Sequence, residues 1–146
     1  MKKLIAAALG LFLVIQLQAA EGQWLTDLTK AQAQAKAEKK LVLVDFTGSD
    51  WCPPCKALHK NVFSAKEFTD YAKTNLVLVE VDFPRRKEQP AELKKANRAL
   101  AEKYNIESFP TVLVFDSNGK QLDRKEGYGG TSAKDFVASL QKLKKG

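Results

Sequence analysis

Residues 41–56 read LVLVDFTGSDWCPPCK and decide the fold. An apolar run with a single acid inside it, Asp45, is followed by a short polar turn and then by Cys52 and Cys55, the only two cysteines of the chain. Such a run is typical of a strand buried on both faces of an α/β sheet. Two thiols separated by two residues at a helix start can close into a disulfide ring and reopen. The stretch therefore predicts a two-electron redox switch.

The residue patterns on either side of this stretch predict alternating helices and strands. A helical crossover makes the first two strands parallel, and a hairpin makes the last two antiparallel. We therefore expect an α/β fold with a mixed central sheet and helices on both faces. Helices are expected over residues 24–40 (capped by Thr26 or Asp27), 53–63, a piece after the cap Ser64, 90–104 and 132–144, and strands over 41–46, 76–83, 111–115 and 121–127.

The composition fits one domain. The chain has 146 residues, of which 45% are hydrophobic, and a net charge of +7. The basic residues lie at 85–87, 94–95 and 142–145, without the interleaved aromatic residues of a nucleic-acid surface. We interpret them as solvated faces and expect no nucleic-acid partner, with weak adhesion to anionic partners left open.

The first 20 residues have the form of a secretory signal, with Lys2 and Lys3 before an apolar run that ends in Ala19 and Ala20. We expect a signal peptide over 1–20 and a single domain over 21–146, in the periplasm or secreted. The run is short for a membrane span, so stable insertion is not expected after cleavage, although an uncleaved anchor is the alternative. A disulfide across two residues restricts the unfolded chain only slightly, which favours redox chemistry over a stabilising role.

Three features together resemble the thioredoxin superfamily. They are Val44-Asp45-Phe46 before the cysteines, the Trp51 and Lys56 that flank the pair, and Phe109-Pro110-Thr111 at the start of a later strand. The resemblance covers about residues 23–143 and is greatest to exported, reductase-type domains of the bacterial periplasm. It implies a thioredoxin-like fold and a thiol–disulfide oxidoreductase that uses its own dithiol and no bound cofactor.

The expected roles of the two cysteines follow from their place at a helix start. Cys52 precedes a proline and suits a cap position, where unpaired backbone N–H groups favour a thiolate. Pro53 and Pro54 have no N–H, which makes the N–H of Cys55 the nearest donor. We expect Cys52 to attack and Cys55 to resolve the mixed disulfide. Pro53 and Pro54 tune the redox poise.

Further site residues are implied mainly by the resemblance. Asp45 would lie beneath the cysteines and take a proton from the resolving thiol, with a pKa raised by burial. Pro110 would be cis, the backbone of Phe109 would pair with substrate, and Trp51 would form an apolar rim or simply pack. Glu80 stands where thioredoxins often have lysine.

The expected partners are cysteine-containing exported proteins and an upstream electron donor, with the protein itself a monomer. A net oxidase or isomerase is the alternative within this class. A copper or zinc protein using Cys52 and Cys55 is a second alternative, with His59 as the nitrogen candidate, although two thiols are too few for a closed zinc site. His59, the only histidine of the chain, is more simply interpreted as a surface residue. The third alternative is an interaction module without redox activity.

Overall fold

The computed structural model describes residues 23–145. The predicted signal peptide, residues 1–20, lies outside this range. The elements, in order, are β1 (Trp24–Leu25), α1 (Leu28–Glu38), β2 (Leu41–Thr47), α2 (Pro53–Leu58), the π-helix η1 (His59–Phe63), α3 (Lys66–Asn75), β3 (Leu76–Asp82), α4 (Ala91–Lys103), β4 (Thr111–Phe115), β5 (Gln121–Glu126) and α5 (Ala133–Lys145).

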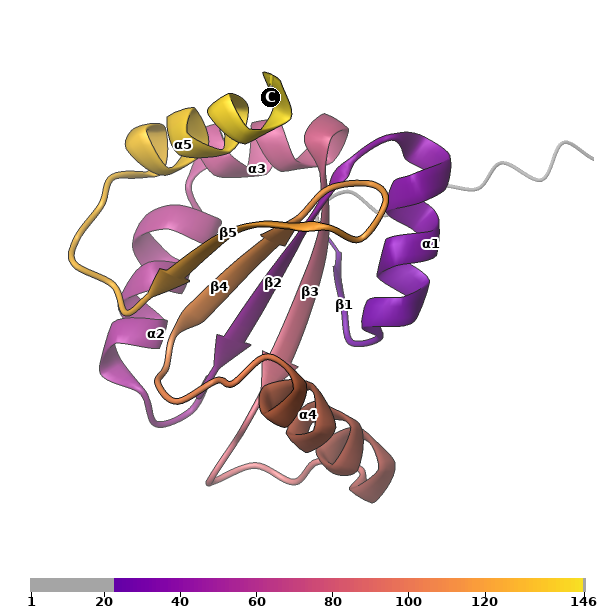
Figure 1. Ribbon diagram of the computed structural model, residues 1–146. Helices are drawn as coiled ribbons and strands as arrows, with labels where there is room; N and C mark the ends of the chain where they lie inside the picture. The colour runs from indigo at the N-terminus through magenta and orange to yellow at the C-terminus, as the bar shows by residue number, and fades with distance from the viewer. Residues whose placement is uncertain (1–22, 146) are drawn as a thin grey trace, which may run out of the picture.

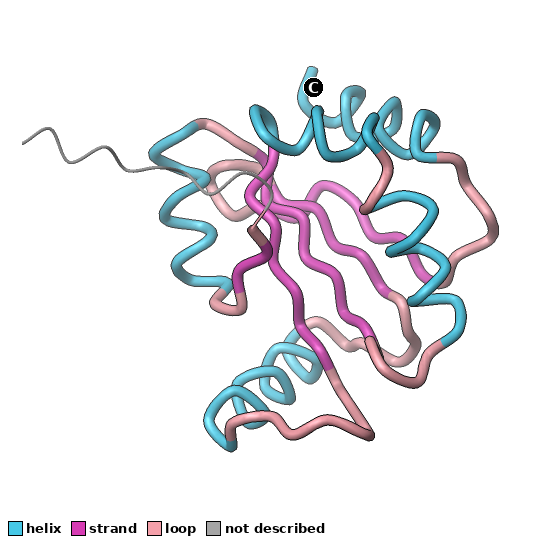
Figure 2. Tube along the Cα trace, turned by 180° about the vertical axis from the view of Figure 1, so that it is seen from behind, coloured by secondary structure: helices cyan, strands magenta, loops and turns pink. Residues whose placement is uncertain are grey.

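The strands form one five-stranded sheet in the order β1-β3-β2-β4-β5 (Figure 1). β3 pairs in parallel with both β1 and β2, whereas β4 pairs antiparallel with β2 and with β5. The predicted mixed sheet is confirmed. Seen from behind, the strands run between two groups of helices (Figure 2).

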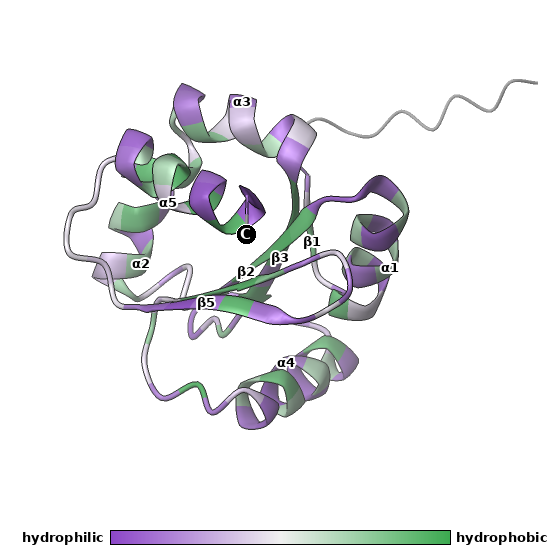
Figure 3. Cartoon of the chain, turned by 45° about the horizontal axis from the view of Figure 1, so that its top comes forward, coloured by the Kyte–Doolittle hydropathy of each residue, from purple (hydrophilic) through white to green (hydrophobic). Residues whose placement is uncertain are grey.

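Each face of the sheet buries its own apolar cluster. Leu43, Leu78 and Val114 point to the face that α2, η1, α3 and α5 cover. Val44, Val79 and other alternate residues point to the opposite face, where α1 and α4 pack. Because both faces are covered, β2 and β4 are buried at every position, and the central strands are mostly apolar (Figure 3). Asp45 of β2 and Asp82 of β3 are the exceptions that are buried nonetheless.

The predicted first helix begins too early. It starts at Leu28, where the side chain of Asp27 accepts a hydrogen bond from the N–H of Lys30 at 3.0 Å. Trp24 and Leu25 instead form β1 and pair with Leu78 and Val79. Trp24 packs against one apolar cluster and Leu25 against the other, which is the alternation of a strand rather than the single stripe of a helix.

The second predicted helix, residues 53–63, is an α-helix only in its first half. It changes to a π-helix at His59, and the N–H of Ser64 donates to the carbonyl of His59. This wide turn places the consecutive residues Val62 and Phe63 both in the core. Ser64 does not cap α3: its hydroxyl lies 3.3 Å from Nδ1 of His59, and α3 begins after Ala65 with no side-chain cap.

The remaining element predictions are confirmed within about one residue. α4 begins directly after Pro90, and Ser132 and Asp135 exchange the hydrogen bonds of a capping pair at the start of α5. Gly119 has a φ of 86° in the β4–β5 turn, a conformation that glycine adopts without strain. Within residues 23–145, no helix is long and apolar enough to cross a membrane.

Candidate active site

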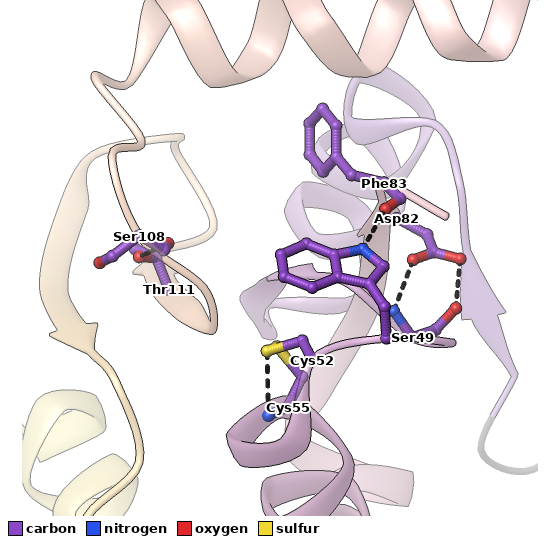
Figure 4. The surroundings of a disulfide bond; sticks show 8 residues. Ser49, Cys52, Cys55, Asp82, Phe83, Ser108 and Thr111 are labelled. Carbon is purple, nitrogen blue, oxygen red and sulfur yellow. Dashed lines mark hydrogen bonds between the residues drawn. A yellow bond between two sulfur atoms is a disulfide. The ribbon is translucent and has the colours of Figure 1, made fainter. Parts of the chain in front are cut away.

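Cys52 and Cys55 lie where β2 ends and α2 begins, and they are joined by a disulfide with their Cα atoms 5.3 Å apart. Cys52 has an extended backbone and is the N-cap of α2, and its sulfur accepts a hydrogen bond from the N–H of Cys55 at 3.4 Å. Figure 4 shows this contact. The predicted cap position and donor are both confirmed. Both cysteines are 3% exposed, whereas Pro53 and Pro54 between them are exposed.

The loop before Cys52 is held by the end of β3. The N–H of Ser49 donates to Oδ1 of Asp82 at 3.0 Å, and its hydroxyl donates to Oδ2 at 2.6 Å (Figure 4). Asp82 is buried, and its remaining charge is balanced by Lys87, whose Nζ lies 3.1 Å from Oδ2. The position of the cysteines therefore depends on a carboxylate of the neighbouring strand.

Trp51 folds back over the same loop. Its Nε1 donates to the carbonyl of Phe83 at 2.8 Å, and its indole covers Gly48. A Cβ on Gly48 would lie 2.4 Å from the nearest indole atom. Trp51 thus has this orientation only because residue 48 has no side chain.

Asp50 fixes a third part of the surroundings, the turn after β3. Its carboxylate accepts hydrogen bonds from the backbone N–H groups of Arg85, Arg86 and Lys87 at 3.0, 2.7 and 3.0 Å. These bonds, that of Arg85 first, lower the pKa of Asp50 below its usual value. These hydrogen bonds therefore attach the turn to the loop that precedes Cys52.

The segment before β4 completes the site. The Phe109–Pro110 peptide bond is cis, as the resemblance implied. Since Thr111 pairs with Phe46 near the end of β2, Pro110 lies at the edge of the sheet from which α2 starts. The ring of Phe109 contacts Trp51 at a centroid distance of 6.0 Å and Phe83 at 5.2 Å. Trp51 and Phe109 are half-buried and form an aromatic wall beside the disulfide.

Asp45 is buried, with 4% of its surface exposed, and its Oδ1 has no hydrogen-bond partner among the described residues. It shares its sheet face with Leu43 and therefore lies on the side that α2 covers. Burial first, then the negative charges of Glu80 and Asp82, raises its pKa from 3.8 to about 8. Asp45 is therefore not an acid at a strand end that reaches solvent.

Glu80 is the direct neighbour of Asp45 in the parallel register of β2 and β3. It is half-buried, and its own pKa is raised, mainly by desolvation and then by the charge of Asp82, while Lys87 and His59 act in the opposite direction. The absence of a lysine here thus places a second acid beside Asp45, and the two carboxyl groups disfavour each other's ionisation.

His59 is exposed, as predicted, and its ring nitrogen faces the hydroxyl of Ser64. Within residues 23–145, no three histidine, cysteine or acidic side chains are grouped so that they could hold a metal ion. Nothing in the arrangement of these residues therefore favours the metal-handling alternative.

Ser49, Asp50 and Asp82 are site residues that the sequence analysis did not identify. Their function is to hold the loop before Cys52, and each acts through a contact with a segment more than 30 residues away in the chain. The one local signal is Asp82, an acid at the end of a buried strand, a position that requires a partner.

Comparisons with known proteins agree with this geometry. The model of the thioredoxin-like domain family matches residues 28–144. The disulfide bond reductase DsbH of Chlamydia pneumoniae is 36% identical over 128 residues, which cover 86% of this chain and 76% of that protein. Thioredoxin H3 of Arabidopsis thaliana is 32% identical and is covered to 94%. The thiol:disulfide interchange protein DsbD of Pseudoalteromonas atlantica is 30% identical, but the match spans only 19% of its length.

Solved structures give the same result. A DsbH oxidoreductase superposes with a TM-score of 0.78 at 31% identity, over 95% of both chains. The C-terminal domain of DsbD from Neisseria meningitidis shares the fold, with a TM-score of 0.59 at 21% identity over 83% of this chain and 99% of that domain. With a disulfide at the N-terminus of α2 facing a cis-proline segment, the chain belongs to the thioredoxin-like family of thiol–disulfide oxidoreductases.

Proposed function

We propose that this thiol–disulfide oxidoreductase acts outside the cytoplasm, chiefly as a reductase of disulfides in exported proteins. The observation that carries the proposal is the Cys52–Cys55 disulfide at the start of α2, with Cys52 as the cap residue. The similarity to a protein named a disulfide bond reductase supports the direction, and the signal-like residues 1–20 support export.

The reaction begins with the reduced protein. The thiolate of Cys52 attacks one sulfur of a substrate disulfide, forms a mixed disulfide and releases the other substrate sulfur as a thiolate, which takes up a proton. The N–H of Cys55, which donates to the sulfur of Cys52, stabilises the thiolate of Cys52.

The second step releases the substrate. The ionised form of Asp45, which is the minor form at neutral pH, takes the proton of Cys55. Cys55 then attacks the sulfur of Cys52, so that the second substrate sulfur leaves and the Cys52–Cys55 disulfide forms. Two electrons and two protons pass to the substrate, and a dithiol protein as electron donor must then restore the thiols of this chain. Asp45 suits the proton transfer because a pKa of about 8 lies near that of a thiol. No bound cofactor is needed for either step.

The substrate is bound beside the disulfide. The backbone of Phe109, next to the cis-Pro110, pairs with an extended substrate segment, while Trp51 and Phe109 form an apolar wall along it. Pro53 and Pro54, exposed between the cysteines, stiffen the ring that closes on oxidation and so tune its potential.

Disulfide reduction assays on cysteine variants test the proposal. With insulin as substrate and a dithiol as electron source, Cys52→Ser should abolish turnover. Cys55→Ser should also stop turnover but should accumulate a mixed disulfide, which a non-reducing gel detects. If the Cys52→Ser variant accumulated the mixed disulfide instead, through Cys55, the assigned roles would be reversed. Full activity of both variants would refute the dithiol mechanism. Equilibration of the wild-type protein with glutathione then separates a reductase from a net oxidase or isomerase.

A further inference from the structure

Two arginines without an acidic partner lie in the turn after β3, which Asp50 holds to the loop before Cys52. They are Arg85 and Arg86, which we call the arginine rim, and both are exposed. Among residues 23–145, neither forms an ion pair with a carboxylate, whereas the next residue, Lys87, pairs with Asp82. Both arginine side chains can therefore bind a carboxylate of another molecule.

The arginine rim is held in place rather than free to move with the chain. Asp50, two residues before Cys52, accepts hydrogen bonds from the backbone N–H groups of both arginines. Phe83, two residues before Arg85, donates its N–H to the carbonyl of Thr47. Its own carbonyl accepts a hydrogen bond from the indole N–H of Trp51. Any substrate that reaches Cys52 is thus presented to the rim at a fixed position.

Arg85 is also oriented. Its guanidinium carbon lies 3.5 Å from the centre of the Trp51 ring, and Trp51 itself contacts Phe109. Contact between the face of the guanidinium and the ring leaves the N–H groups at its edge free for a planar acceptor. A carboxylate is the acceptor that this fork fits best, through two parallel hydrogen bonds.

We propose that the arginine rim selects protein substrates that have aspartate or glutamate beside the reacting cysteine. This inference rests on the proposed function, because it assigns a preference to the same substrate site. The substrate segment that pairs at Phe109 passes along Trp51, and its acidic side chains reach the rim from there. The positive charge of the chain, which is +7 and falls to +5 without residues 1–20 and their Lys2 and Lys3, acts in the same direction by attracting acidic partners.

A pair of disulfide peptides tests the inference. The two peptides are identical except that two acids beside one cysteine, Asp and Glu, are replaced by Asn and Gln. The reduced wild-type protein should react with the acidic peptide about three to ten times faster than with the amide peptide at low ionic strength, and the ratio should fall with added salt.

The ratio of the two rates is then compared among variants, so that any general effect on reactivity cancels. In Arg85→Gln/Arg86→Gln the ratio should approach one, and Arg85→Lys should keep part of it. Arg98→Gln, which removes an exposed arginine of α4, is the matched control and should keep the wild-type ratio.

A wild-type ratio near one, or an unchanged ratio in the double variant, would overturn the inference while leaving the proposed function intact. If neither peptide is reduced, the proposed function fails. In that case the affinities of the two peptides for the oxidised protein are measured by tryptophan fluorescence. The inference then requires that the wild type bind the acidic peptide more tightly than the amide peptide and that the double variant bind the two equally.

Discussion

At the scale of the residue, Asp45 is the most unusual group in the molecule. A carboxyl group that lies inside a sheet, with one oxygen unpaired among the described residues, favours its protonated form at neutral pH, because burial raises its pKa to about 8. The sequence showed an acid within an apolar strand, and burial and a raised pKa could be predicted from that alone. That Glu80 is its direct neighbour could not, because the register between β2 and β3 is set by pairing across 35 residues.

Replacement of this acid should change how stability depends on pH. The unfolded chain loses the proton of Asp45 near pH 3.8 and the folded protein near pH 8, so the free energy of unfolding falls as pH rises through this interval. In Asp45→Asn this contribution is absent. The free energy of unfolding of the variant minus that of the wild type should therefore increase by at least about 2 kcal/mol between pH 5 and pH 9. Urea denaturation of the two oxidised proteins measures this, and a gain that does not vary with pH would contradict it.

Removal of the neighbouring charge should make Asp45 easier to ionise. Glu80→Gln removes the larger of the two electrostatic causes of the raised pKa, so the titration of Asp45 should move to lower pH by about one pH unit. Carbon NMR of the Asp45 carboxyl group follows this titration directly. Glu92→Gln, an exposed change in the first turn of α4, serves as the control and should leave the midpoint unchanged. A midpoint that is the same in all three proteins would mean that burial alone sets the pKa.

At the scale of the element, the loop between β2 and α2 is harder to predict from the sequence than β2 or α2. The strand and the helix could be predicted from apolar runs and from a proline at a helix start, because those signals are local. Gly48, Ser49 and Asp50 gave no comparable signal beyond that of a turn, since each residue owes its role to β3 or to the turn that follows it. The misplaced start of α1 has the same origin, because Trp24 and Leu25 become a strand only when β3 is there to pair with them.

A methyl group at residue 48 should displace Trp51. The Cβ of Gly48→Ala would lie within 2.7 Å of three indole atoms. The indole must therefore move and lose its hydrogen bond to Phe83. We expect a loss of about 1–3 kcal/mol in the free energy of unfolding, together with a change in tryptophan emission in the native state. Gly129→Ala, where a Cβ would meet nothing within 4 Å, is the control. Equal stability of the two variants would show that the loop adapts without cost.

At the scale of the whole molecule, the direction of electron flow is a difference in stability between two forms of one fold. A strong oxidant of this class owes its potential to a stabilised reduced form. For the reductase proposed above we therefore expect the reverse, with the oxidised protein unfolding at a higher urea concentration than the reduced protein. Parallel denaturation with and without excess dithiol measures the difference. A more stable reduced form would assign the protein to the oxidase alternative.

Much of the whole fold could be predicted, because the thioredoxin-like motifs fix which helices and strands must be present. The proline before β4 lies far in the sequence from the cysteine pair and the acid in β2, and the fold brings it to the edge of the sheet at which α2 begins. The sequence alone does not encode the redox potential in any readable pattern, because it depends on how Pro53 and Pro54 change the relative energies of the dithiol and the disulfide.

The two margins of the sheet have a consequence for the extended substrate segments proposed above. β1 offers only two residues for pairing, and β5 has the charged side chains of residues 123–126, which form the ion pairs Arg124–Glu126 and Lys125–Asp123. Short or charged edge strands are poor templates for a further strand. Neither margin therefore invites an extended chain to add itself to the sheet, and the segment before β4 is left as the place where the proposed substrate pairs.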